Sequence, residues 1–257
     1  MKKHINMNVP LVSIITPMFN SEKFISETIQ SVQKQSYTNW EMILVDDCST
    51  DQTRLLVEKF SKNDNRIKLH QLKTNSGPAK ARNKGIEIAY GKYLTFLDAD
   101  DLWFPDFIEN SILHINTSGI HFVFSSYRRS DEKLNFIYSD FIVPKKVTYT
   151  DILKTNSISC LTAFIDIEIL GKKSMPDIYK RQDMGLWLQY LKEIPFAQGI
   201  QEPKAIYRIR ANSLSRNKTN LLKYQWQFYR KVEHLNLFQS VFYMTHWMFR
   251  GFIKYRS

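Results

Sequence analysis

Cysteine is scarce in this chain of 257 residues, and no long apolar run occurs before residue 220. The two cysteines, Cys48 and Cys160, do not form a CxxC pair, which argues against a zinc knuckle or a disulfide framework. The N-terminal apolar run is short, is broken by Pro17 and lacks a small-residue cleavage pattern, so it does not resemble a signal peptide. No internal repeat or low-complexity segment is present. These absences predict a cytoplasmic protein.

Acidic residues are also in deficit. The chain has 25 Asp and Glu against 36 Lys and Arg, a formal net charge of +11. Such an excess attracts anionic partners, which include nucleic acid, phosphorylated small molecules and acidic membrane surfaces. Hydrophobic residues make up 43% of the chain, enough for a sizeable core.

The first hundred residues alternate between strand-like and helix-like patterns. Strands are expected at residues 11–16, 41–46, 66–72 and 92–97. Helices are expected at residues 21–35, with Ser21 as the N-cap, through 55–60 and at 77–90. Further on, the pattern predicts a helix through 107–113, a strand at 120–127 and a helix at 182–194, whereas residues 127–180 are mixed. Alternation with short connections predicts an α/β fold with a parallel, doubly wound sheet.

Two acidic clusters follow predicted strands. Asp46 and Asp47 end one strand, and "LDADD" places Asp98, Asp100 and Asp101 after another. Ligands of such sheets bind beyond the carboxyl ends of the strands, so both clusters are expected on one rim. Two like charges about 4 Å apart repel by roughly 4 kcal/mol at an effective dielectric near 20. A solvated turn would relieve this repulsion, and a divalent cation would make the crowding favourable.

Four segments together resemble the family 2 glycosyltransferases: "VSIITPMFN", "ILVDDCSTDQT", "NSGPAKARNKGIEIAYGKYLTFLDADD" and "RQDMGLWLQY". The resemblance covers roughly residues 10 to 215. It implies a GT-A fold, a Rossmann-like nucleotide-binding mixed sheet with flanking helices, that uses nucleotide-activated sugars. We therefore expect a GT-A domain at residues 1–218 and a helical extension at residues 219–257.

On the nucleotide side, the resemblance implies that Asp47, rather than Asp46, binds the N3–H of uracil. The alternative is that both aspartates cap the following loop or helix. Pro17 and Phe19 match a segment that lines the base pocket, although packing alone would also explain them. Gly77 is expected to let its loop approach the nucleotide.

The "DAD" segment matches the DxD element of the family. The resemblance places Asp98 near the ribose or the metal, and Asp100 as the direct ligand of Mn²⁺ or Mg²⁺. Asp101 is expected to join through water or to cap the next helix. Arg82 occupies the position of an arginine near the diphosphate. Arg210 stands where the family often has a histidine, so it either binds the diphosphate or belongs to a structural loop.

The resemblance assigns the general base to Asp183. Inverting transfer needs a carboxylate to take the proton of the acceptor hydroxyl as that hydroxyl attacks the anomeric carbon. The family commonly has an acidic pair here, and this chain has Gln182 before Asp183. The alternative is that Asp183 is an N-terminal helix residue favoured by the helix dipole, and both roles are compatible.

The extension is aromatic and basic. Residues 220–257 hold eleven aromatic residues, six Lys or Arg and one acidic residue, Glu233. One helical face carries Phe238, Val241, Phe242, Thr245, Met248, Phe249 and Phe252. The other carries Gln239, Tyr243, His246, Arg250 and Lys254. We favour peripheral attachment to the inner face of the cytoplasmic membrane over packing against the domain or a subunit, and we expect neither a membrane span nor nucleic-acid binding.

The leading hypothesis is an inverting, metal-dependent hexosyl- or N-acetylhexosaminyltransferase. It would move a sugar from a nucleotide sugar, a UDP-sugar, to a glycan or lipid-linked acceptor in bacterial surface polysaccharide synthesis. A non-catalytic membrane-associated scaffold is the first alternative. A sugar-phosphate nucleotidyltransferase is disfavoured because "ITPMFNSEKF" contains no glycine. No pattern predicts the donor sugar, the acceptor, the linkage or the oligomeric state.

Overall fold

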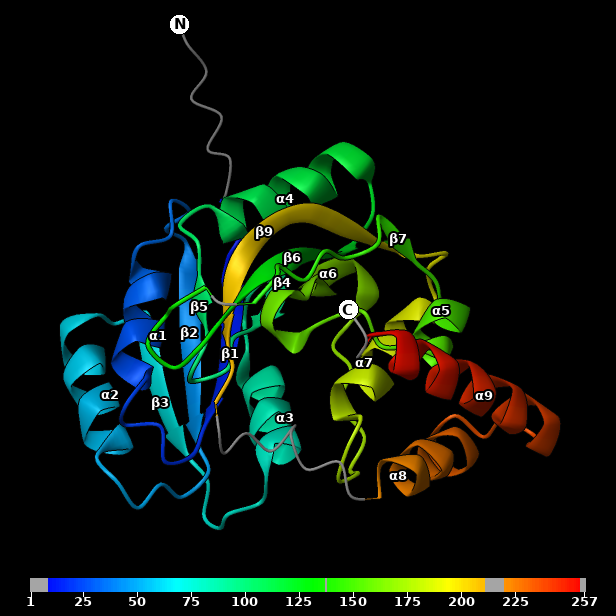
Figure 1. The fold of residues 1–257 in the computed structure, drawn as a ribbon. Helices are drawn as coiled ribbons and strands as arrows, with labels where there is room; N and C mark the ends of the chain where they lie inside the picture. Colours follow the sequence, from blue (N-terminus) through cyan, green and yellow to red (C-terminus); the bar gives the residue numbers. More distant parts are fainter. Residues whose placement is uncertain (1–8, 137, 211–219, 255–257) are drawn as a thin grey trace, which may run out of the picture.

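The computed structural model describes residues 9–136, 138–210 and 220–254. Its strands are β1 (Val12–Met18), β2 (Trp40–Asp46), β3 (Ile67–Gln71), β4 (Tyr93–Phe96), β5 (Leu102–Trp103), β6 (Phe122–Ser130), β7 (Lys146–Val147), β8 (Phe164–Asp166) and β9 (Ala197–Arg208). Within the described chain they form one sheet in the order β3-β2-β1-β4-β8-β6-β9-β5, and β7 pairs with β9. Figure 1 shows the sheet running between helices through the main body of the molecule, with the C-terminal helices outside it.

The parallel half of the sheet follows the alternation in the sequence. β1 pairs in parallel with β2 and β4, and β2 with β3. The connecting helices are α1 (Ile25–Gln33), α2 (Thr53–Asn63) and α3 (Pro78–Ile88). One expected detail is wrong: Ser21 is not the N-cap of α1, because the chain first makes a turn in which the carbonyl of Ser21 accepts the N–H groups of Phe24 and Ile25.

The other half makes the sheet mixed, as expected for a GT-A fold. β8 runs antiparallel to both β4 and β6, whereas β9 runs parallel to β6 and antiparallel to β5 and β7. The helices here are α4 (Phe107–Ser118), α5 (Tyr149–Lys154), α6 (Ile167–Leu170) and α7 (Gln182–Leu191), with a 3₁₀ turn, η1 (Cys160–Thr162). The mixed segment, residues 127–180, therefore supplies β7, β8 and the short helices around them.

Two apolar cores lie on opposite faces of the sheet. In β2, Met42 and Leu44 pack into the core covered by α1, α2 and α4. Their neighbours Ile43 and Val45 pack into the core covered by α3, α5, α6 and α7. This alternation is the period of a strand buried on both faces, and it gives the three-layer arrangement seen in Figure 1.

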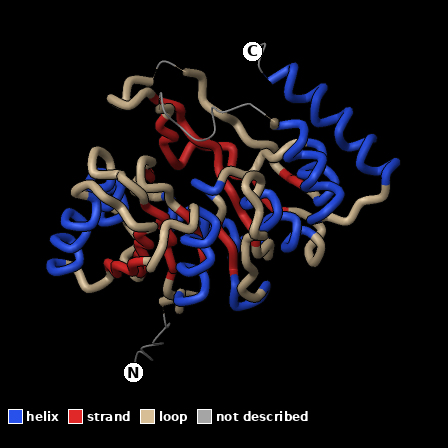
Figure 2. Tube along the Cα trace, turned by 90° about the horizontal axis from the view of Figure 1, so that it is seen from below, coloured by secondary structure: helices blue, strands red, loops and turns tan. Residues whose placement is uncertain are grey.

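The C-terminal extension contains α8 (Leu221–Gln227), a π-helical turn, η3 (Phe228–Val232), and α9 (Leu237–Lys254). These elements lie beside α5 and α7, and Figure 2 shows α9 at the rim of the molecule. No helix within the described ranges is long and apolar enough to cross a membrane. The expected boundary between residues 218 and 219 lies outside the described residues, so the division into two domains stays a prediction.

Candidate active site

The acidic residues at the strand ends meet at one edge of the parallel half of the sheet. β2 ends at Asp46, and β4 ends at Phe96, shortly before Asp98. The register pairs Met18 of β1 with Asp46, and Ile15 of β1 with Phe96. The prediction that both acidic clusters lie on one rim is therefore confirmed.

Each carboxylate of the DAD segment is paired with an arginine. Nη2 of Arg82, on α3, donates to Oδ1 of Asp98 at 2.5 Å. Nε of Arg210, which follows β9, lies 2.6 Å from Oδ2 of Asp100. The Asp98 and Asp100 side chains remain 31% and 18% exposed, so both can be reached from solvent. The two guanidinium groups thus offset the repulsion between the crowded carboxylates.

Asp101 has a different environment, because its side chain is buried. Its Oδ1 accepts the backbone N–H of Arg208 at 2.8 Å, and its carbonyl accepts the hydroxyl of Thr28 at 3.0 Å. Burial, together with the carboxylates of Asp100 and Asp98, raises the pKa of Asp101 well above its usual value. Asp101 therefore ties the DAD segment to α1 and β9. Of its two expected roles, capping of the next helix is wrong, because the N-cap of α4 is Asp106, and the role through water stays a prediction.

Asp183 lies in the first turn of α7, as predicted, and its carboxylate acts electrostatically on Arg82, the arginine that pairs with Asp98. Nδ2 of Asn156 donates to Oδ2 of Asp183 at 2.9 Å. Burial disfavours the charged form of Arg82, but the carboxylates of Asp98 and Asp183 raise its pKa, so it stays a cation. Burial also raises the pKa of the neighbouring Cys160 thiol, which keeps it neutral. The fold thus places the predicted base within electrostatic reach of the guanidinium that pairs with Asp98.

Asp47 supports the loop that precedes α3. Its Oδ1 accepts the N–H of Ser76 at 2.6 Å, and its Oδ2 accepts the N–H of Gly77 at 2.7 Å. Asp46 similarly accepts the N–H and the hydroxyl of Ser49. Asp46 therefore caps the loop that follows it, whereas Asp47 supports the distant loop before α3 and, among the described residues, does not cap its own following loop or helix. Each carboxylate oxygen of Asp47 keeps a second lone pair, so its role in uracil binding stays a prediction.

The other residues predicted to contact the nucleotide lie along the same rim. Pro17 is buried within β1 opposite Val45, whereas the ring of Phe19, just beyond the strand, is 49% exposed. Gly77 has φ +87°, and a Cβ placed on it would meet no heavy atom within 4 Å. Phe19 and Gly77 thus border open space, and Pro17 is a packing residue in the described contacts. Base binding by this segment stays a prediction.

The carboxylates of Asp98 and Asp100 suit a divalent cation that takes its remaining ligands from the bound substrate. No group of three or more His, Cys, Asp or Glu side chains in the described part of the chain could hold a metal. Asp98 and Asp100 nevertheless offer partly exposed carboxylate oxygens. Mg²⁺ is commonly held by one or two carboxylates together with substrate phosphates. The site is therefore suited to a metal–diphosphate complex.

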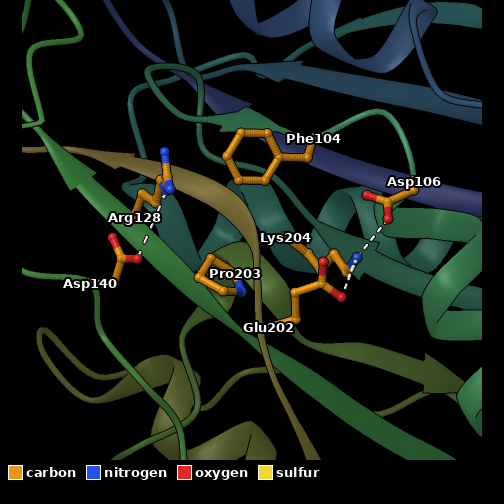
Figure 3. A pocket seen from close by; sticks show the side chains of 7 residues that line it. All are labelled: Phe104, Asp106, Arg128, Asp140, Glu202, Pro203 and Lys204. Atoms are coloured by element: carbon orange, nitrogen blue, oxygen red, sulfur yellow. Dashed lines mark hydrogen bonds and ion pairs between the residues drawn. The ribbon is translucent and has the colours of Figure 1, made fainter.

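Besides a cavity of about 610 Å³ at Phe196 and Gln198, whose lining includes no predicted site residue, two further cavities lie near β9. The first, of about 440 Å³, is lined by Phe104, Asp106, Arg128, Asp140, Glu202, Pro203 and Lys204 (Figure 3). Its charges are satisfied internally, because Nζ of Lys204 lies 2.5 Å from Asp106 and 2.8 Å from Glu202. The second, of about 400 Å³, is lined in part by Arg210. The second cavity therefore adjoins the acidic site, whereas the lining of the first includes none of the predicted site residues.

The comparison with known families decides the class of protein. The model described as "Glycosyl transferase family 2" matches residues 13–165, which run from β1 into β8 and include the DAD segment. The chain belongs to this family. It is therefore a glycosyltransferase, and the sugar-phosphate nucleotidyltransferase alternative is not supported.

Two bacterial relatives match almost the whole chain. A Bacillus subtilis (strain 168) protein named as a teichuronic acid biosynthesis glycosyltransferase, TuaG, is 40% identical over 245 residues, with 95% of each chain covered. The Escherichia coli UDP-Glc:alpha-D-GlcNAc-diphosphoundecaprenol beta-1,3-glucosyltransferase WfgD is 37% identical over 248 residues, again with 95% of each chain covered. This chain thus has enzymes of bacterial surface-polysaccharide synthesis among its relatives.

Solved structures confirm the GT-A fold. S. aureus TarS 1-349 in complex with UDP-GlcNAc has a TM-score of 0.72 at 22% identity, over 94% of this chain and 72% of that one. The mannosyltransferase PcManGT from Pyrobaculum calidifontis, in complex with GDP-Man and Mn²⁺, has a TM-score of 0.69 at 20% identity, over 88% and 65%. At these identities the likeness establishes the fold.

Sequence reasoning missed two residues of the site. Asn156 lies in the mixed segment, where a single amide side chain gives no periodic or motif signal. Arg208 lies two residues before Arg210, and the same family segment pointed only to Arg210. Both residues contact a site residue that is distant in sequence, so only the fold shows that they belong to the site.

Proposed function

We propose that this glycosyltransferase is an inverting, metal-dependent enzyme that transfers a hexose or N-acetylhexosamine from a UDP-sugar to a lipid-linked glycan in bacterial surface polysaccharide synthesis. The observation that supports the proposal is the environment of Arg82, which donates to Asp98 and has its pKa raised by the carboxylates of both Asp98 and Asp183. This shared influence on one guanidinium supports a donor site and a general base that lie near each other. The name of the E. coli relative, with its UDP-Glc donor and diphosphoundecaprenol acceptor, supports the substrate classes.

In this proposal, the donor diphosphate lies at the DAD segment. Asp98 and Asp100 would hold a divalent cation, which supplies charge neutralisation to the leaving diphosphate. Arg82 and Arg210 present planar guanidinium groups beside it, a geometry suited to phosphate oxygens. The uracil and ribose would extend toward Asp47, Gly77 and the exposed ring of Phe19.

Asp183 would act on the acceptor side. Asp183 lies in the first turn of α7, near the positive end of the helix dipole, and the amide of Asn156 donates to its Oδ2. The acceptor hydroxyl forms the new bond to the anomeric carbon as the bond to the diphosphate oxygen breaks. The proton moves to Asp183, and the leaving diphosphate keeps the electron pair. Attack opposite the leaving group inverts the anomeric configuration.

We also propose that the enzyme works at the inner face of the cytoplasmic membrane as a peripheral protein. A lipid-linked acceptor would be met there, and the basic, aromatic C-terminal extension suits an interfacial position. The alternative of a non-catalytic scaffold differs from this proposal in one respect, turnover.

A transfer assay with the Asp183→Asn variant tests the proposal. The wild-type protein is incubated with Mn²⁺, a panel of UDP-sugars and an undecaprenyl-diphosphate-linked sugar, and UDP release and product mass are followed. We expect transfer with an inverted anomeric centre by NMR, and its loss in Asp183→Asn with UDP binding retained. Asp177→Asn is the matched control, because the Asp177 side chain is 78% exposed in a surface pair with Lys80. Transfer at the wild-type rate in Asp183→Asn would refute the base, and no turnover with any donor would favour the scaffold.

A further inference from the structure

The helix α9 presents an apolar face to solvent. The side chains of Phe238, Phe249 and Phe242 are 86%, 66% and 51% exposed. They belong to a continuous exposed set, called here the outer face: Leu237, Phe238, Val241, Phe242, Met248 and Phe249. Soluble proteins rarely leave so many large apolar side chains together on one surface, so the outer face indicates a binding partner.

The opposite face of the same helix already holds it to the catalytic domain. Ser240 and Met244 are buried, and Tyr243 and Trp247 pack partly buried against the core that α5 and α7 cover. The preceding turn is fixed as well, because the hydroxyl of Tyr229 donates to the carbonyl of Leu153 at 2.5 Å. From the sequence, packing against the domain was the alternative to membrane attachment. The structure uses the other face for that purpose and leaves the outer face uncovered in the described chain.

Charge favours a lipid surface as the partner. The only acidic residue among residues 220–257 is Glu233, which is turned inward: it accepts the hydroxyl of Tyr149 at 2.6 Å and pairs with Lys192 at 2.9 Å. Lys223 and Lys231, on α8 and η3, are exposed. An apolar helix face accompanied by basic residues is typical of helices that lie in the interface of anionic membranes. A second copy of this chain, with a net charge of +11, would bring like charges together.

We propose that the outer face of α9 binds the surface of an anionic phospholipid bilayer, with the helix axis in the membrane plane. The phenylalanine side chains enter the boundary between headgroups and acyl chains, and the basic residues of α8 and η3 contact the lipid phosphates. The inference deepens the proposed function, since a bilayer is where a lipid-linked acceptor resides. Vesicle binding itself requires neither nucleotide nor metal.

Co-sedimentation of the full-length protein with vesicles tests the proposal. One set of vesicles contains phosphatidylcholine alone, and the other contains equal parts of phosphatidylcholine and phosphatidylglycerol. We expect wild-type protein to bind the anionic vesicles, and the triple variant Phe238→Ser, Phe242→Ser, Phe249→Ser to bind at least about tenfold more weakly, because buried apolar area drives interfacial binding. Leu113→Ser and Ile169→Ser are matched controls, because these side chains are 57% and 58% exposed on α4 and α6. They should bind like wild type.

Three results would overturn the inference. The first is equal vesicle binding by the wild type and the triple variant. The second is vesicle binding that high salt abolishes and that the triple variant retains, because such binding would rest on charge attraction alone. The third is a wild-type dimer by light scattering that becomes monomeric in the triple variant while neither binds vesicles, which would make a second copy the partner. Titration with UDP and Mn²⁺ separates this test from the proposed function: a protein that binds vesicles and no nucleotide would refute only the latter.

Discussion

Replacing Arg210 with alanine should tighten the binding of Mn²⁺ to the nucleotide-free protein. Nε of Arg210 lies 2.6 Å from Oδ2 of Asp100, and the two side chains are 33% and 18% exposed. A metal ion that uses this carboxylate must replace the guanidinium. The interaction free energy of a partly exposed ion pair of this kind is about 1–2 kcal/mol, more than that of a fully exposed pair and less than the Coulomb energy of a buried one. Its removal should therefore raise the affinity for Mn²⁺ by about 5- to 30-fold.

The assay is the electron paramagnetic resonance signal of free Mn²⁺, titrated with protein in the absence of nucleotide. Arg210→His should also tighten binding, since it replaces a cation with an imidazole that can ligate the metal. Arg128→Ala is the matched control, because Arg128 forms a more exposed pair with Asp140 at 3.8 Å and should leave the affinity unchanged. Unchanged or weaker Mn²⁺ binding in Arg210→Ala would refute the idea that Arg210 and the metal compete for Asp100.

Three further predictions concern the base, the pH dependence and the core. Asn156→Ala should slow transfer about tenfold at unchanged UDP affinity, since Asp183 loses the donor that orients it; rates and calorimetry check this. The hydrogen bonds from Arg66 hold the pKa of Asp64 at about 2, below its usual value. Asp64→Asn should therefore cost about 1–2 kcal/mol of unfolding free energy at neutral pH, and the cost should vanish as the pH falls from about 4 to 2, measured by urea unfolding. Trp187→Ala, at a fully buried position, should cost about 3–5 kcal/mol in the same measurement.

Local patterns predicted the parallel half of the fold well, because each strand there is followed by a helix that covers it. The end of each strand then located Asp46 and Asp98 on one rim without knowledge of the pairing. The antiparallel half was less accessible. β8 has only the residues Phe164–Asp166, and it joins β4 to β6 through pairings that no short sequence window contains.

The site was predicted as far as single residues carry motif signals. Asp183 and Asp100 were predicted by resemblance, and their roles stay predictions, whereas Asn156 and the backbone contact from Arg208 to Asp101 depend on segments that are distant in sequence. The same limit applies to α9. Its periodicity showed two faces, but the choice of the inward face depended on how Ser240 and Met244 fit the domain.

Calorimetric titration of UDP, with Mn²⁺ and with chelator, tests the central claim most directly. The protein should bind UDP in the presence of Mn²⁺, and the binding should fall steeply with chelator and in Asp100→Ala, because Asp100 would hold the cation that neutralises the diphosphate. GDP, CDP and ADP should bind more weakly than UDP. Two results would contradict the account. One is UDP binding that stays as tight in chelator, or in Asp100→Ala, as in the wild-type protein with Mn²⁺. The other is no binding of any nucleoside diphosphate.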